Sequence, residues 1–226
     1  MMKNKWFLVG VIGCCMAAAL GFAACAEQDN QTGTDDPSGE HTHTFTGGVC
    51  ECGEQDAQFT GDAVNYKLSA GTYTGEMTSG KPDGEGKIYL TDAEFTGTWE
   101  NGVPVTGVKT VYESGTTTPI GTYTGGIDEN YACSGDGVME YANGDRYDGG
   151  WAGGVYSGEG KYTFASGMYY EGEYANGQRE GEGVFTWSTD GNLENGWLFE
   201  GTFKADKAYY GKTTTTKTEG LIWYEG

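Results

Sequence analysis

One residue pattern recurs along the last two-thirds of the chain and constrains the fold more than any other feature. Each copy reads Tyr or Phe, any residue, Gly, any residue, an aromatic or apolar residue, a turn ending in Gly, then Gly-x-Gly and two alternating apolar residues. Clear copies start at Tyr73, Tyr147 and Tyr170, and degraded copies start at Phe95, Tyr123 and Phe199. Intervals of 22 to 29 residues between these starts indicate a repeat architecture.

The degraded copies depart from the pattern at specific positions, and each departure gives an expectation about the structure. In the Phe95 copy the Gly-x-Gly is lost, Gly107 comes one place late, and Thr110 and Tyr112 stand where the apolar pair is expected. The Tyr123 copy has one extra residue before its Gly-x-Gly. In the Phe199 copy we expect an insertion over 204–218, after which the pattern resumes at Gly220, Ile222 and Tyr224.

The pattern predicts β-hairpins. Apolar residues and glycines alternate with polar ones, so they share one face of a strand. Asn-Gly and Ser-Gly pairs at 143–144, 166–167 and 176–177 are typical of tight hairpin turns. We therefore expect an all-β fold: an elongated, twisted antiparallel sheet of about six hairpins, with glycines that let aromatic rings from neighbouring copies lie across the backbone. The 41 glycines and 14% aromatic residues disfavour helix bundles and Rossmann-like folds.

The repeat closely resembles the MORN repeat, and the resemblance covers residues 73 to 226 approximately. It implies an interaction module, because MORN repeats occur in proteins that scaffold, dimerise or lie near membranes. Phospholipid binding is often proposed for them. The net charge of −20 disfavours direct binding to acidic phospholipid or nucleic acid.

The N-terminus has the pattern of an export signal. Residues 1–24 form the predicted signal peptide, with two lysines followed by an apolar run that starts at Trp6. The ending Phe22-Ala-Ala-Cys25 is similar to the bacterial lipobox, with Phe22 where Leu is usual. The resemblance implies lipidation of Cys25 and a location on the outer face of the cell membrane. Cleavage after Ala26 to give a soluble product, and an uncleaved anchor, are the alternatives.

Residues 25–60 are expected to form a lipid-attachment cysteine, an acidic linker and a small Cys/His segment, followed by the repeat domain over 61–226. The linker 27–40 has no apolar residue. His41, His43, Cys50 and Cys52 offer the usual four ligands of a structural Zn²⁺, the one cofactor that the sequence suggests. The alternatives are that these residues are simply exposed, or that Cys50 and Cys52 oxidise with each other or with Cys133.

The sequence offers little for catalysis, and we expect no catalytic residue. Both histidines, His41 and His43, precede the repeats, so histidine chemistry is excluded there. Glu85, Glu159 and Glu182 occupy the same place within Gly-x-Gly and could form a row for glycoside hydrolysis or cation binding. The simpler interpretation is that they keep the sheet soluble.

Four aromatics outside the regular columns could stack on sugar rings or on a partner chain, although they could equally cover the second face of the sheet: Tyr89, Tyr156, Tyr169 and Trp197. The function we expect is an exported, lipid-anchored, non-catalytic binding or scaffolding module. Its expected partner is an envelope or extracellular protein or glycan, and it contacts the membrane through its lipid anchor. The alternatives are a carboxylate-based carbohydrate-active enzyme and a zinc-binding surface protein.

Overall fold

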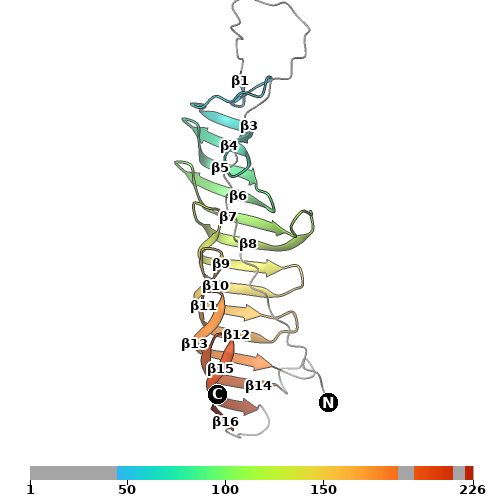
Figure 1. Cartoon of the computed structure of the whole chain (residues 1–226), viewed down its shortest axis with the longest axis vertical. Helices are drawn as coiled ribbons and strands as arrows, with labels where there is room; N and C mark the ends of the chain where they lie inside the picture. The colour runs from blue at the N-terminus through green and yellow to red at the C-terminus, as the bar shows by residue number, and fades with distance from the viewer. Residues whose placement is uncertain (1–44, 188–195, 216–221, 226) are drawn as a thin grey trace, which may run out of the picture.

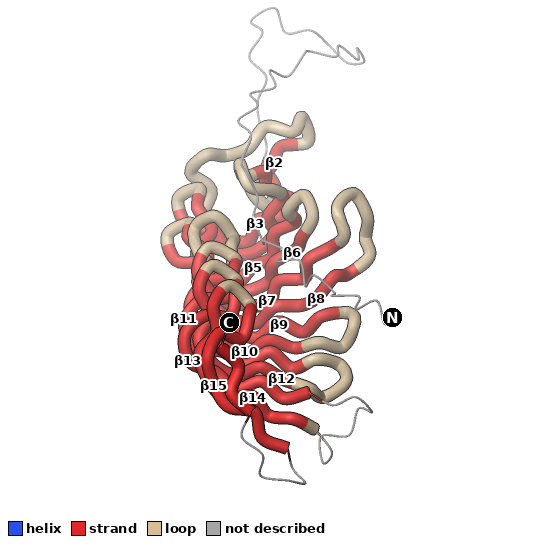
Figure 2. The backbone as a smooth tube through the Cα atoms, turned by 60° about the horizontal axis from the view of Figure 1, so that its bottom comes forward, coloured by secondary structure: helices blue, strands red, loops and turns tan. Residues whose placement is uncertain are grey.

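The computed structural model describes residues 45–187, 196–215 and 222–225. Within them, fourteen strands form one antiparallel sheet in chain order, from β3 to β16, and β1 and β2 form a separate small pair. The strands stack one after another along the long axis of the molecule (Figure 1), and their turns line both long sides (Figure 2). The strands are β1 (Phe45–Thr46), β2 (Val49–Cys50), β3 (Gly61–Lys67), β4 (Thr72–Thr78), β5 (Lys81–Tyr89), β6 (Ala93–Glu100), β7 (Val103–Tyr112), β8 (Pro119–Ile127), β9 (Cys133–Tyr141), β10 (Arg146–Ala152), β11 (Val155–Thr163), β12 (Tyr169–Ala175), β13 (Gln178–Trp187), β14 (Trp197–Lys204), β15 (Lys207–Thr215) and β16 (Ile222–Glu225).

The predicted all-β fold is confirmed: every regular element of the described residues is a strand, and successive repeats supply successive hairpins. The described part of the chain accordingly holds no apolar helix of membrane-spanning length.

A continuous row of glycines sets the register of the sheet. Each of the twelve strands from β4 to β15 contributes one glycine, and the glycines of neighbouring strands stand opposite one another: Gly75, Gly86, Gly97, Gly107, Gly125, Gly137, Gly149, Gly160, Gly172, Gly183, Gly201 and Gly211. The row continues through the degraded copies, so the sheet keeps one register throughout.

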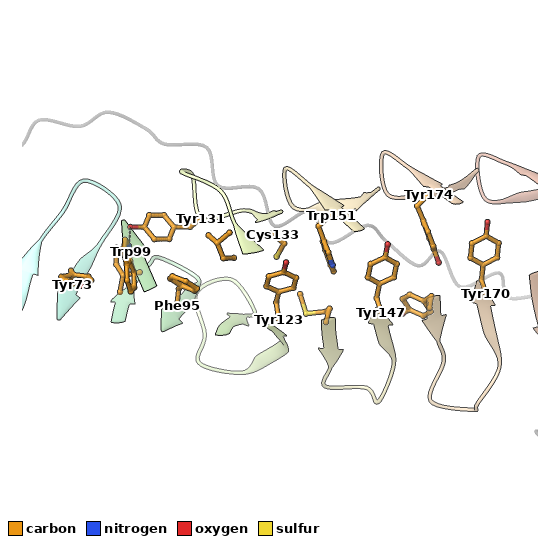
Figure 3. Packing of buried hydrophobic residues seen from close by; sticks show 14 of the residues in the cluster. Tyr73, Phe95, Trp99, Tyr123, Tyr131, Cys133, Tyr147, Trp151, Tyr170 and Tyr174 are labelled. Atoms are coloured by element: carbon orange, nitrogen blue, oxygen red, sulfur yellow. Dashed lines mark hydrogen bonds between the residues drawn. The ribbon is translucent and has the colours of Figure 1, made fainter. Parts of the chain in front are cut away.

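At this row the strands bend. Tyr147 and Trp151 are four residues apart on β10, a separation of about 13 Å along a straight strand. Their ring centroids are only 5.1 Å apart, at 88°. The pairing with β11 shifts register between Gly149 and Trp151, which marks a bulge at the bend. The two halves of each strand therefore face one another and enclose the aromatic core (Figure 3).

The rings of the repeat tyrosines lie across glycines, as the sequence predicted, but each of these glycines is on the following strand of the same copy and not in a neighbouring copy. A Cβ added to Gly160 would lie 2.6 Å from Cζ of Tyr147, and one added to Gly137 would lie 2.5 Å from Cζ of Tyr123. Each tyrosine hydroxyl then donates to the backbone carbonyl three residues later, at the bulge. These bonds are Tyr73 to Glu76 (2.8 Å), Tyr123 to Gly126 (2.9 Å), Tyr147 to Gly150 (2.9 Å) and Tyr170 to Glu173 (3.0 Å).

Two copies begin with Phe instead, and in these the bulge moves. In the β6–β7 and β14–β15 hairpins the register shifts one residue later, at Thr98/Trp99 and Thr202/Phe203. A phenylalanine has no hydroxyl with which to satisfy a carbonyl freed at the earlier position. Gly107 pairs with Gly97, so it corresponds to the second glycine of Gly-x-Gly, not to a delayed first one.

The apolar pair predicted for the Phe95 copy was wrong. Lys109, not Thr110, lies opposite Phe95, and Val111, not Tyr112, lies opposite Ala93. Lys109 is only 3% exposed, and its Nζ donates to the backbone carbonyl of Tyr131 at 2.6 Å. The lysine stem replaces an apolar side chain, while the ammonium holds the β8–β9 turn over the core.

We predict that Lys109→Met lowers the free energy of unfolding by about 1.5–3 kcal/mol, because the Tyr131 carbonyl loses a charged donor in a buried position. Chemical denaturation of the variant measures this. Lys161→Met is the control: Lys161 lies exposed on the opposite face, and its loss should cost less than about 1 kcal/mol. If Lys109→Met is as stable as the parent, the free-energy cost of burying the ammonium equals the free energy gained from its hydrogen bond.

The predicted insertion in the Phe199 copy was also wrong. β14 and β15 form a tight hairpin that pairs Gly201 with Gly211, so the second strand of this copy begins at Lys207. Thr213, 2% exposed, stands opposite Phe199 in the place of an apolar residue. Ile222 and Tyr224 belong to the next strand, β16, while Gly220 lies outside the described residues.

The segment before β3 covers the free edge of that strand. The backbone N–H of Val64 on β3 donates to the carbonyl of Gly47 at 3.1 Å, and that of Gly80 in the β4–β5 turn donates to the carbonyl of Phe59 at 2.8 Å. Pairing of this kind blocks strand addition at an exposed edge.

Candidate binding surface

The inner face of the sheet is filled by the protein's own side chains. The first ring of each copy is at most 3% exposed, and the aromatic or apolar residue four places later is at most 6% exposed. In Figure 3, Trp151 and Tyr174 point from one half of the folded sheet towards Tyr147 and Tyr170 on the other. This face therefore serves stability, and the outer face is the surface available for recognition.

Two of the four candidate aromatics belong to the inner face. Tyr156 stacks on Tyr147 with ring centroids 3.8 Å apart, and its hydroxyl bonds that of Tyr141. Trp197 stacks on Trp187 at 6.1 Å. Burial and the Tyr141 hydroxyl raise the pKa of Tyr156, so it remains a neutral phenol in the folded protein.

The other two lie on the outer face, each beside a lysine. Tyr89 is 49% exposed, and Lys87 Nζ stands 4.7 Å from its ring centroid. Tyr169 is half-buried, with Lys161 Nζ 4.0 Å from its ring centroid. Cation–π contacts of this geometry are attractive, but they also cover part of the ring.

A lysine one residue after the row glycine recurs in three copies and always reaches a glutamate. The Nζ–Oε2 distances are 2.9 Å for Lys87–Glu94, Lys161–Glu171 and Lys212–Glu200. The hydrogen bond that Lys87 donates to Glu94 raises the pKa of Lys87, which keeps its ammonium charged. An exposed or half-buried tyrosine accompanies each pair, and we call these three groups the Lys-Glu-Tyr clusters: Lys87, Glu94 and Tyr89; Lys161, Glu171 and Tyr169; Lys212, Glu200 and Tyr210.

The third cluster lines a depression that the sequence analysis missed. It opens across β13, β14 and β15, has a volume of about 260 Å³, and is lined by Glu182, Glu200, Gly201, Thr202, Tyr210, Gly211 and Lys212. Tyr210 lies within 204–218, where the sequence predicts an insertion and the structure has β15. The sequence nevertheless contains a signal for this strand, because Lys212 follows Gly211 as Lys87 follows Gly86 and Lys161 follows Gly160.

The carboxylates from Gly-x-Gly do not form one compact site. Glu85, Glu159 and Glu182 are all exposed, and Glu85 on β5 is six strands from Glu159, or about 29 Å. Glu159 and Glu182 are two strands apart with Glu173 between them, and Glu173 Oε1 accepts from the Glu182 backbone N–H at 3.1 Å. Exposed acids spaced over an open face suit solubility better than acid–base catalysis.

Charge is absent from the centre of the outer face on β6–β8. Thr96, Val108 and Thr124 adjoin one another there across the three strands, and Val108 is 44% exposed. In so acidic a chain, this neutral area is the part of the face where a partner would meet the least electrostatic repulsion.

The predicted zinc ligands lie only in part within the described residues. Cys50 is buried, Cys52 is exposed in the turn that follows it, and a hydrogen bond with Cys50 raises the pKa of the Cys52 thiol. His41, His43 and the proposed lipidation site Cys25 lie outside the described residues. Among the residues that are described, His, Cys, Asp and Glu make no group of three or more suited to a metal ion, and zinc binding stays a prediction.

Comparison with known proteins supports the repeat assignment. Four segments match the MORN repeat: residues 73–92, 129–146, 147–169 and 170–191. The β6–β7 and β14–β15 hairpins fall outside these matches, yet they continue the same glycine row. No curated protein matches the chain. An all-β sheet of MORN-type hairpins is typical of a non-enzymatic binding module.

Proposed function

We propose that the chain is an exported, lipid-anchored surface protein whose MORN-type sheet is a non-catalytic binding or scaffolding module. One observation carries the binding role: the inner face is occupied by the core rings, which leaves a long outer face with polar clusters and a neutral centre. A bent, ring-filled sheet is stiff, so it can hold binding groups at fixed distances.

The proposed partners are envelope or extracellular proteins or glycans. The net charge of −20 disfavours nucleic acid and anionic lipid headgroups, so contact with the membrane is assigned to a lipid on Cys25. The acidic segment 27–40 would act as a spacer between that lipid and the sheet.

Mass spectrometry of the mature N-terminus tests the anchor, using the membrane fraction of a bacterial host. We expect a diacylglyceryl adduct on Cys25, and we expect Cys25→Ala to abolish the adduct and the membrane association together. Cys14→Ala, within the predicted signal, is the matched control and should leave both unchanged. An unmodified N-terminus on protein recovered from the medium would contradict the anchor, and an uncleaved chain in the cytoplasm would contradict export.

A further inference from the structure

The depression on β13–β15 differs from its surroundings in combining four kinds of polar and apolar group. Tyr210 is 55% exposed and offers an aromatic ring at its border. Lys212 Nζ is held 2.9 Å from Glu200, and Thr202 Oγ1 donates to Glu182 Oε1 at 2.8 Å. The backbone of Gly201 and Gly211 completes the lining.

This combination matches the surface of a sugar ring. A pyranose has an apolar face of C–H groups that packs on an aromatic ring, and a rim of hydroxyls that both donate and accept hydrogen bonds. Two carboxylates supply acceptors, the ammonium supplies donors and the threonine hydroxyl supplies both. The 260 Å³ volume corresponds to about nine water molecules, enough for a single sugar unit.

The charges of the lining and of the whole chain indicate whether the sugar is acidic or neutral. The lining carries two carboxylates and one ammonium, and the whole chain has a formal charge of −20. An acidic sugar would be repelled by both the local and the overall charge. A neutral sugar would avoid that repulsion.

The other Lys-Glu-Tyr clusters provide an internal comparison. At Tyr89 and Tyr169 a lysine ammonium stands over the ring, 4.7 Å and 4.0 Å from the centroids. In the third cluster Tyr210, Glu200 and Lys212 all line the depression. This shared lining favours the third cluster as the site of a ligand.

We propose that this depression binds a hexose unit of a neutral polysaccharide. The inference rests on the proposed function of the outer face and names a ligand class for one part of it. An open site for one sugar binds weakly, with a dissociation constant on the order of millimolar. Stable attachment would require a polymer that engages several anchored copies at once.

Isothermal titration of the full chain in detergent with cellohexaose, maltohexaose and an oligogalacturonate tests the proposal. We expect at least one neutral hexasaccharide to bind more tightly than the acidic one. Tyr210→Ala should weaken that binding about tenfold or more, and Glu182→Ala about threefold to tenfold. Tyr89→Ala, which removes a tyrosine of similar exposure from the same face, should change it less than about twofold.

Three outcomes would overturn the proposal: no binding of either neutral hexasaccharide up to about 10 mM, preference for the acidic oligomer, or equal losses in Tyr210→Ala and Tyr89→Ala. The Glu182→Ala variant provides an independent test if Tyr210→Ala does not fold. If no sugar binds as expected, the lipid on Cys25 and the binding of a protein elsewhere on the outer face are unaffected. Failure of the sugar proposal is therefore distinguishable from failure of the proposed function.

Discussion

Replacing Gly160 with alanine should lower the free energy of unfolding by about 3 kcal/mol or more, and Gly160→Val should prevent folding. The added Cβ would lie 2.6 Å from Cζ of Tyr147, a distance that real Cβ atoms essentially never show. Tyr147 cannot yield easily, because it is fully buried and its ring contacts Trp151, Tyr156 and Tyr174. Chemical denaturation of the alanine variant measures the loss.

Two controls isolate this ring contact as the cause. Gly153→Asn changes a turn glycine with φ of 56° and open space around it, a conformation that asparagine tolerates, so it should cost less than about 1 kcal/mol. In a Tyr147→Leu background, Gly160→Ala should cost less than in the parent, because the clashing ring is gone. Equal costs in the two backgrounds would contradict the account of the glycine row.

The protein should unfold cooperatively when the pH rises above about 10, the ordinary pKa of a phenol. Burial raises the pKa of the core tyrosines Tyr73, Tyr147, Tyr162, Tyr170 and Tyr174 well above that value. The folded state therefore retains protons that the unfolded chain releases. Their contribution to stability is fully present below pH 10 and is lost as the pH rises towards the folded-state pKa.

The expected loss is large because several tyrosines act together. Each one lowers the free energy of unfolding by about 1.4 kcal/mol per pH unit above its unfolded pKa. A total stability of about 5–15 kcal/mol would therefore be exhausted within about two pH units. Tyrosinate absorbance and circular dichroism followed in one alkaline titration should change together.

Tyr147→Phe gives the matched control for the alkaline transition. It should lower stability at neutral pH by about 1 kcal/mol, through loss of the bond to the Gly150 carbonyl, and should make the pH dependence shallower. Gradual tyrosinate formation with unchanged circular dichroism would mean that the rings ionise inside the folded sheet, contrary to this account.

The fold was predictable from sequence in the copies that have every residue of the repeat pattern. In the copies starting at Tyr73, Tyr147 and Tyr170, tyrosine, glycines and apolar residues stand at constant spacing, and the structure forms the expected hairpins. The packing of rings on glycines was predictable too, because only glycine leaves room for it. The bend at the glycine row was not, since it lies at bulges that only the strand pairing reveals, and the Phe95 and Phe199 copies bend there without a tyrosine hydroxyl.

The errors have a common physical origin. Lys109 and Thr213 lie on the inner face, where the hydrophobic pattern predicts apolar residues. Their strands keep this register because the pairing with neighbouring strands fixes it, so a polar residue can stand at an inner position. The sequence predicts an insertion over 204–218, but this range contains β15 and Tyr210. The candidate site was thus only partly predictable, because Glu182, Glu200 and Tyr210 come from three strands whose pairing had to be known first.

Site-specific photo-crosslinking in the bacterial host tests most directly whether the outer face is the working surface. A photoreactive amino acid would replace Val108 at the neutral centre, Tyr210 at the depression, or Thr117 in the exposed β7–β8 turn as control. The account predicts a discrete crosslinked envelope protein or glycan from at least one outer-face position and none from Thr117. Crosslinks from Thr117 alone, or from none of the three positions, would contradict it.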